Sequence, residues 1–343
     1  MDVKEFKLYQ QLENFGLNFE QMELLPFRPT NIVPFDEQAF ILESPLGNRA
    51  LWIHKGREAG LVRQIQLLEI CKQQGLKGFL YPLELSDGRT YARFGLESWC
   101  YLTPWPATEK VYFSQEDHLK LIVKLLVDFR TAVTEGGFLF YSPDSKSGNL
   151  LQKFPEILKQ LHTFKLLSCN RLKPTIFDRF FLNYVDEIIR QTEQALDFFE
   201  KSDYGNLIAE LNPRNVIVNK LTRHNLRLSQ GETAVCLRLD DCQWDLPIID
   251  LAILLIKSGR SAKWDMQWFR NVLNEYQKYY RISPGELEII YAYLAFPWGL
   301  YRLASRYYYN RVNWPLGIFV EKLKRLLADE RKRIQFINNL RSL

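Results

Sequence analysis

Residues 208–218, IAELNPRNVIV, place a carboxylate and a side-chain amide five residues apart in a polar loop. A carboxylate such as that of Glu210 can act as a general base. The amide oxygen of Asn215 is a ligand that magnesium accepts, and in an Asn-Pro context it also suits a turn. The segment therefore has the form of a loop that carries a catalytic acid. Whether the chemistry is kept depends on the residues that accompany it.

The composition indicates a folded protein and does not point to one class of binding partner. Of 343 residues, 47% are hydrophobic, which is enough for one large core or two modest ones. Charged residues make up 25%, so wholesale disorder is excluded, and a net charge of +5 does not require a nucleic acid partner. None of the five cysteines forms a C-x-x-C pair, so we expect reduced thiols rather than a disulfide framework or a zinc site.

The N-terminal sequence MDVKEFKLYQQ lacks the apolar region of a secretory signal, and no apolar run is long enough for a transmembrane segment. We therefore expect a soluble protein that is made in the cytoplasm and is not secreted through a signal peptide.

The first hundred residues are typical of a sheet with one helix. After a short helix and loop in residues 1–28, the extended runs NIVPF, QAFILES and RALWIH predict three strands. Apolar spacing predicts a helix over residues 58–74, with Gly75 at its C-terminus. The Asp-Gly pair in SDGR predicts a hairpin between the runs GFLYPLEL and TYARF.

The pattern changes after LTPWP. Most later segments have helical periodicity, and two short strands, NVIVN and AVCLRL, are expected with a polar connection between them. This predicts an N-terminal lobe over residues 1–103, a hinge at 104–106, and a helical C-terminal lobe over 107–343.

This layout resembles the kinase-like phosphotransferases. The motif ELNPRN resembles the catalytic loop of aminoglycoside and choline kinases, and DLPIIDLA resembles the helix that follows their metal-binding segment. Residues 295–326 are similar to the C-terminal part of the spore coat protein S family, whose members share that fold. The resemblance covers nearly the whole chain and is strongest over residues 210–326. It implies an α+β, bilobal protein-kinase-like fold with a small antiparallel-sheet N-lobe and a large, mostly helical C-lobe.

The resemblance also implies a degenerate catalytic site. Glu210 stands where an Asp base is usual, and Ile208 stands where a His is usual. The acid that binds magnesium should precede Asp250 by twelve residues, where this chain has Arg238. A guanidinium is a permanent cation without a lone pair to donate, so it cannot be a magnesium ligand. Asp250 is expected to keep a structural role, holding the catalytic loop.

In a working phosphotransferase, Asn215 and Asp240 would be the metal ligands, with Asp241 as an alternative. We also expect Arg238 to form an internal ion pair with Glu210 or Asp240 in place of the ion.

The resemblance also implies a set of nucleotide-binding positions. The lysine of the third strand corresponds to Lys55 or to His54, and these neighbours point to opposite faces of a strand. Glu58 or Glu69 corresponds to the glutamate of the following helix. Thr103 immediately precedes the hinge, and Trp105 lies within it. The segment that would cover the phosphates, NIVPFDEQAFIL, contains no glycine.

We expect a pseudokinase of the spore coat that binds other spore coat proteins, with no cofactor. One alternative is an active, ATP- and magnesium-dependent phosphotransferase that uses Glu210 and an unknown small-molecule acceptor. The other is a pseudokinase that binds nucleotide without metal. The run SRYYYNRVNW is either a contact surface or a set of core aromatic residues with at least one exposed tyrosine.

Overall fold

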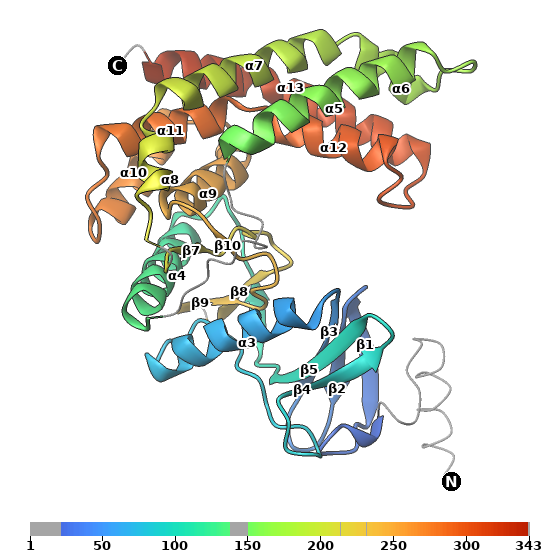
Figure 1. Ribbon diagram of the computed structural model, residues 1–343, viewed down its shortest axis with the longest axis vertical. Helices are drawn as coiled ribbons and strands as arrows, with labels where there is room; N and C mark the ends of the chain where they lie inside the picture. Colours follow the sequence, from blue (N-terminus) through green and yellow to red (C-terminus); the bar gives the residue numbers. More distant parts are fainter. Residues whose placement is uncertain (1–21, 138–149, 213, 231, 342–343) are drawn as a thin grey trace. The chain divides into compact units, whose positions relative to one another are not determined.

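The computed structural model describes residues 22–137, 150–212, 214–230 and 232–341. The helix predicted within residues 1–28 falls largely outside them. The described chain divides into two compact units (Figure 1). Unit 1 contains residues 22–112, 124–137 and 222–242, and unit 2 contains residues 113–123, 150–221 and 243–341.

Unit 1 is built on a five-stranded antiparallel sheet with the strand order β1-β2-β3-β5-β4. The three strands predicted first in the sequence are confirmed. The strands are β1 (Asn31–Asp36), β2 (Ala39–Glu43), β3 (Arg49–Lys55), β4 (Tyr91–Gly95) and β5 (Ser98–Pro104).

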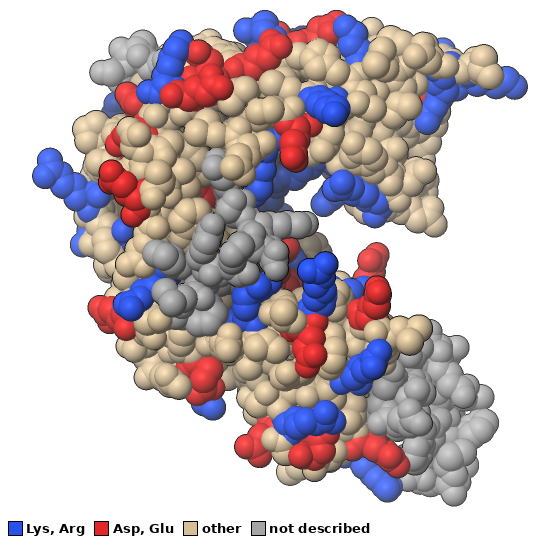
Figure 2. All heavy atoms as spheres, viewed as in Figure 1, with Lys and Arg blue, Asp and Glu red and all other residues tan. Residues whose placement is uncertain are grey.

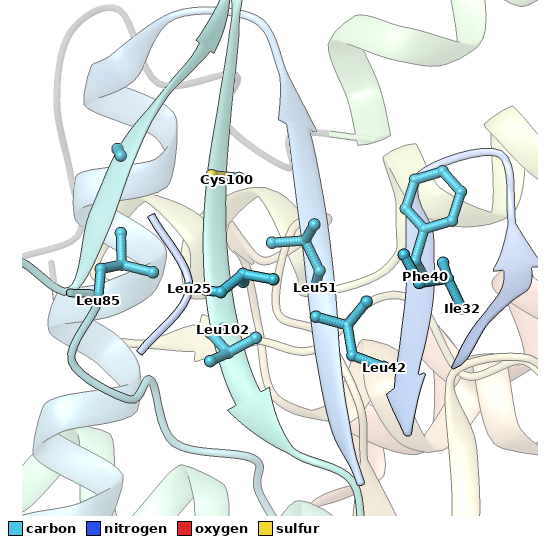
Figure 3. Packing of buried hydrophobic residues seen from close by; sticks show 9 residues of the cluster. Leu25, Ile32, Phe40, Leu42, Leu51, Leu85, Cys100 and Leu102 are labelled. Carbon is cyan, nitrogen blue, oxygen red and sulfur yellow. The ribbon is translucent and has the colours of Figure 1, made fainter. Parts of the chain in front are cut away.

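Both faces of this sheet are buried, because apolar residues occupy successive positions along β2, β3 and β5. One face packs Phe40, Leu51 and Leu102 into a cluster closed by Leu25 and Leu85 from loops (Figure 3). The opposite face carries a second cluster, made of Ala39, Ile41, Ala50, Trp52, Leu61, Leu80, Tyr101, Val235 and Leu237. Burial on both faces fixes the strand register, since a slip of one residue would exchange the two sets.

The predicted helix is α3 (Glu58–Gln73), and Gly75 follows it with a positive φ of 70°. The predicted hairpin is only partly correct. Its turn is present, closed by the N–H of Gly88 on the carbonyl of Leu85. The run before the turn is not a strand, however, and makes only isolated bridges, at Phe79 and Leu83.

A second, three-stranded sheet of unit 1 has the order β6-β8-β9, with β6 (Thr108–Lys110), β8 (Leu226–Ser229) and β9 (Thr233–Cys236). The sequence predicted a polar connection where β8 lies. That expectation was wrong, because Leu226 and Leu228 alternate with polar residues and are buried. In unit 2, β7 (Val216–Ile217) pairs with β10 (Gln243–Trp244).

Helices make up most of the remainder. Both α6 and α11 begin with a capping box, Thr175–Asp178 and Ser283–Glu286. The helices are α4 (Glu116–Glu135), α5 (Leu150–Cys169), α6 (Ile176–Leu182), α7 (Val185–Lys201), α8 (Tyr204–Ala209), α9 (Ile248–Ser261), α10 (Met266–Gln277), α11 (Pro284–Ala295), α12 (Trp298–Tyr308) and α13 (Leu316–Arg341). None of the helices in the described ranges is long and apolar enough to cross a membrane.

An antiparallel sheet in the N-terminal part followed by a mostly helical remainder confirms the predicted α+β fold class. Unit 1 also takes in part of α4 and the strands β8 and β9, which come later in the chain than residues 104–106. The hinge at those residues stays a prediction.

Candidate functional site

The candidate catalytic loop begins where α8 ends. The backbone N–H of Glu210 donates to the carbonyl of Asn206 at 3.0 Å, and the Glu210 side chain is exposed. Ile208, two residues earlier, is buried and packs in the core of unit 2. The predicted base position therefore presents a solvated carboxylate, while the position of the usual histidine contributes apolar packing.

Asn212 shapes the turn that follows. Its side-chain oxygen accepts from the N–H of Arg214 at 2.9 Å, and its carbonyl accepts from the N–H of Asn215 at 2.9 Å. The indole N–H of Trp244 donates to the same carbonyl at 3.1 Å. The turn is thus closed by Asn212, and Asn215, the predicted metal ligand, lies at its end, immediately before β7.

Asp250 holds the end of this loop. It lies in the first turn of α9, and its two carboxylate oxygens accept from the N–H groups of Val218 at 2.7 Å and Asn219 at 2.8 Å. Asn219 adopts a positive φ of 60°, so the hydrogen bond from its N–H to Asp250 fixes a left-handed backbone conformation. Burial raises the pKa of Asp250 to about 7, and the two N–H donors act in the opposite direction.

A second buried carboxylate, Asp245, was not selected from the sequence. It accepts from the Tyr204 hydroxyl at 3.1 Å, and that hydroxyl accepts in turn from the N–H of Leu150. Burial raises the pKa of Asp245 to about 7. This chain of hydrogen bonds joins α5, α8 and the segment before α9, so unit 2 positions its loop through two carboxylates rather than one.

Arg238, in unit 1, lies beside two carboxylates. Its Nη2 donates to Oδ2 of Asp36 at 2.8 Å, and its Nε lies 3.9 Å from Oδ2 of Asp240. The guanidinium also lies over the ring of Trp52, 5.2 Å from its centroid. The Arg238 side chain is only 9% exposed. The pair with Asp36 was missed because Asp36 is 202 residues away in the chain.

The backbone of Arg238 is fixed by Asn225. The Asn225 amide donates to the Arg238 carbonyl at 3.0 Å, and its oxygen accepts from the Arg238 N–H at 2.9 Å. Asn225 is fully buried and precedes β8. Asn225 therefore satisfies both backbone polar groups of Arg238, as a paired strand in a sheet would. These two hydrogen bonds fix the backbone at Arg238.

Aromatic side chains cover the same face of the sheet. Phe35, next to Asp36 on β1, packs edge-on against Trp52 and Trp105, with ring centroids 6.2 and 5.0 Å apart. The Trp52 indole donates to the hydroxyl of Thr103 at 2.9 Å, and Thr103 is fully buried. Trp52 thus contacts both predicted nucleotide-binding residues, because it donates to Thr103 and its ring centroid lies 6.1 Å from that of Trp105.

The alternation along β3 separates the two candidates for the strand lysine. Ala50, Trp52 and His54 share the face that packs against Leu61 of α3, whereas Lys55 points to the other face and is exposed. Burial lowers the pKa of His54, while a hydrogen bond with the backbone of Arg57 and the charge of Asp240 act in the opposite direction.

Glu58, the first residue of α3, is exposed and accepts from the Tyr91 hydroxyl at 3.1 Å. Glu69, the alternative to Glu58, accepts from Gln73 on the solvent side of α3. Among the described residues, no group of three or more His, Cys, Asp or Glu side chains is placed to hold a metal ion.

The structure therefore brings His54, Thr103, Trp105, Arg238 and Asp240 together in unit 1, around Trp52. In unit 2, Glu210 and Asn215 lie on one loop, and Asp250 binds the backbone at Val218 and Asn219, just after that loop. Asp36, Asn225 and Asp245 are additional residues of these groups. The functional roles predicted for the members stay predictions.

Comparisons with known proteins agree with this architecture. No family model matches the chain. Over 171 residues it is 25% identical to spore coat protein S of Bacillus subtilis, an alignment that covers 49% of this chain and 48% of that protein. The chain thus matches about half the length of this curated relative.

Among solved structures, an aminoglycoside phosphotransferase from Alicyclobacillus acidocaldarius superposes with a TM-score of 0.75, at 19% identity and over 93% of both chains. An AMP-bound spectinomycin phosphotransferase gives a TM-score of 0.67 at 12% identity over 97% of both chains. The choline kinase of Streptococcus pneumoniae gives 0.52 at 13% identity over 97% of this chain and all of that one. The chain therefore has the kinase-like phosphotransferase fold and is similar in sequence to spore coat protein S over about half its length.

Proposed function

We propose that the protein is a pseudokinase of the spore coat, in which an internal, partly buried ion pair replaces the metal-binding acid of a phosphotransferase. The single observation that carries this proposal is the contact between Arg238 and Asp36. Sequence similarity to spore coat protein S supports the coat context, and by the same analogy the partners are other spore coat proteins.

The residues around Arg238 do not fit a magnesium ion. The position that should supply a carboxylate supplies a cation, and that cation already uses Asp36 as its acceptor at 2.8 Å. Asp240, the predicted substitute ligand, lies 3.9 Å from the Nε of the same guanidinium. A divalent cation placed beside Asp240 would therefore be repelled by Arg238 at short range.

The segment that would cover the nucleotide phosphates, residues 31–42, is held by contacts within unit 1. The N–H of Gln38 donates to Asp36 at 2.8 Å, which orders the turn after β1 while Asp36 accepts from Arg238. Phe35 packs on Trp52 and Trp105, and the Arg227 guanidinium lies 5.5 Å from its ring centroid. A phosphate-covering segment in a working enzyme needs freedom to approach its ligand, whereas here its side chains already have partners.

One observation favours a second candidate, a pseudokinase that binds nucleotide without metal. The Nε of Arg238 is buried and has no hydrogen-bond acceptor. A buried donor without an acceptor costs free energy, and a phosphate oxygen would satisfy it. In this candidate the nucleotide is a structural ligand rather than a substrate.

Thermal unfolding with ATP tests both candidates, in the presence of magnesium and of EDTA. Ligands that bind only the folded state raise the midpoint, so millimolar ATP reveals even weak sites. We expect no shift that requires magnesium. A shift with ATP in EDTA supports the metal-free candidate, and a shift that needs ATP and magnesium together refutes the pseudokinase and restores the phosphotransferase.

A further inference from the structure

Three cationic side chains gather on two neighbouring helices of unit 2. Lys257 lies on α9, and Arg302 and Arg306 lie four residues apart on α12, hence on one face of that helix. The helices meet beside Gly299, where a Cβ atom would lie 3.1 Å from Nη2 of Arg260 on α9. The charges of Arg302 and Arg306 both act on Lys257.

Within the described part of the chain, no ion pair joins an acidic side chain to Lys257, Arg302 or Arg306. Their neighbour Arg260 shows the contrast, since it is paired with Asp329 at 2.8 Å. Figure 2 shows basic and acidic side chains interspersed over much of the visible surface. The three cations therefore lie near one another without an acidic ion-pair partner in the described part of the chain.

Aromatic rings position the two arginines. The Arg302 guanidinium lies 5.2 Å from the centroid of Trp298, and that of Arg306 lies 5.5 Å from the centroid of Trp314. A ring beneath a guanidinium holds its plane but takes none of its five in-plane N–H donors. One hydrogen bond of Arg302 goes to the side chain of Tyr293, and the rings orient the remaining donors so that another group can accept from them.

Without a bound ligand, the three neighbouring cations destabilise the folded protein. Like charges four residues apart on a helix repel each other. Lys257 is half-buried, and its pKa is lowered to about 8, first by burial and then by Arg302, Arg260 and Arg306. A methionine would fill the same space without this repulsion, so packing alone does not account for a lysine. An anion bound between the two helices would convert the repulsion into attraction.

We propose that Lys257, Arg302 and Arg306 form a binding site for a ligand that carries a phosphate monoester. Such a group has close to two negative charges near neutral pH and three acceptor oxygens, which match one ammonium and two guanidinium groups. A single carboxylate would leave more than one cation unbalanced. The site lies wholly in unit 2 and does not depend on Arg238 or on the proposed loss of catalysis.

Titration calorimetry with inorganic phosphate and with glycerol phosphate tests the site, against sodium chloride at equal ionic strength. We expect both phosphates to bind the wild-type protein, and Lys257→Met and Arg306→Gln each to weaken binding about tenfold or more. Lys332→Met is the matched control, because Lys332 is an exposed lysine on α13 of the same unit. That variant should bind phosphate as the wild type does.

Thermal unfolding without ligand supplies a second readout. If Lys257 serves ligand binding rather than folding, Lys257→Met should unfold at the same temperature as the wild type or higher. The variant should also lose the rise in unfolding temperature that phosphate causes in the wild type. Phosphate binding that survives both Lys257→Met and Arg306→Gln would overturn the proposal. So would a phosphate effect no larger than that of chloride, or tighter binding of malonate than of either phosphate.

Discussion

Replacing Asp36 by alanine should destabilise unit 1 more than the loss of an ordinary surface ion pair. The Arg238 side chain is 9% exposed and that of Asp36 is 28% exposed, so the pair is intermediate between buried and superficial. Breaking a fully buried pair costs about 3–5 kcal/mol, and surface pairs contribute about 0–1 kcal/mol. We expect Asp36→Ala to lower the free energy of unfolding by about 2 kcal/mol, because Arg238 keeps its charge but loses its 2.8 Å acceptor.

The assay is urea unfolding followed by tryptophan fluorescence, combined with a double-mutant cycle. Arg89→Met is the control, since it removes an ion pair of the same unit whose arginine is 64% exposed, and it leaves the backbone N–H of residue 89 bonded to Asp87. This variant should leave the unfolding curve nearly unchanged. Arg238→Met combined with Asp36→Ala should cost less than the sum of the single changes. If Asp36→Ala behaved like the control, or if the two changes were additive, the ion pair would not hold unit 1 together as described.

Two further predictions concern the carboxylates of unit 2. Asp250→Ala should lower the free energy of unfolding by about 2–4 kcal/mol, because the N–H groups of Val218 and Asn219 lose their acceptors. Urea unfolding measures this change, and an unchanged free energy of unfolding would contradict the prediction. Burial raises the pKa of Asp245 from 3.8 to about 7, so the folded state binds its proton more tightly, and stability should fall as pH rises through that interval. Asp245→Asn, which keeps an acceptor for Tyr204, should flatten this part of the pH profile, and an unchanged slope would argue against a raised pKa.

Much of the fold follows from local pattern in the sequence. The strands β1, β2 and β3 and the helix α3 are predictable because apolar periodicity and a C-terminal glycine act over short distances. The strand β8 was missed because only two apolar residues, Leu226 and Leu228, mark it within a polar stretch. Its formation depends on pairing with β6 and β9, which no local pattern reveals.

The candidate site was predictable only where a motif preserved its spacing. Asp250 and Arg238 could be placed by counting along the chain, and the internal pair of Arg238 with Asp240 was expected. The closer partner, Asp36, could not be found in this way, because a contact over 202 residues depends on how β1 packs beside the segment after β9. Sequence also left His54 and Lys55 open, and the strand alternation settles which of them shares a face with Trp52.

In our proposal, Arg238 takes the place of the metal-binding acid. This can be tested by titrating the wild-type protein with a fluorescent ATP analogue, in parallel series with magnesium and with EDTA. We expect that magnesium does not strengthen binding, whether or not the nucleotide binds in EDTA. Binding that is tighter in magnesium, and that is lost when Asn215 and Asp240 are replaced by alanine, would contradict it.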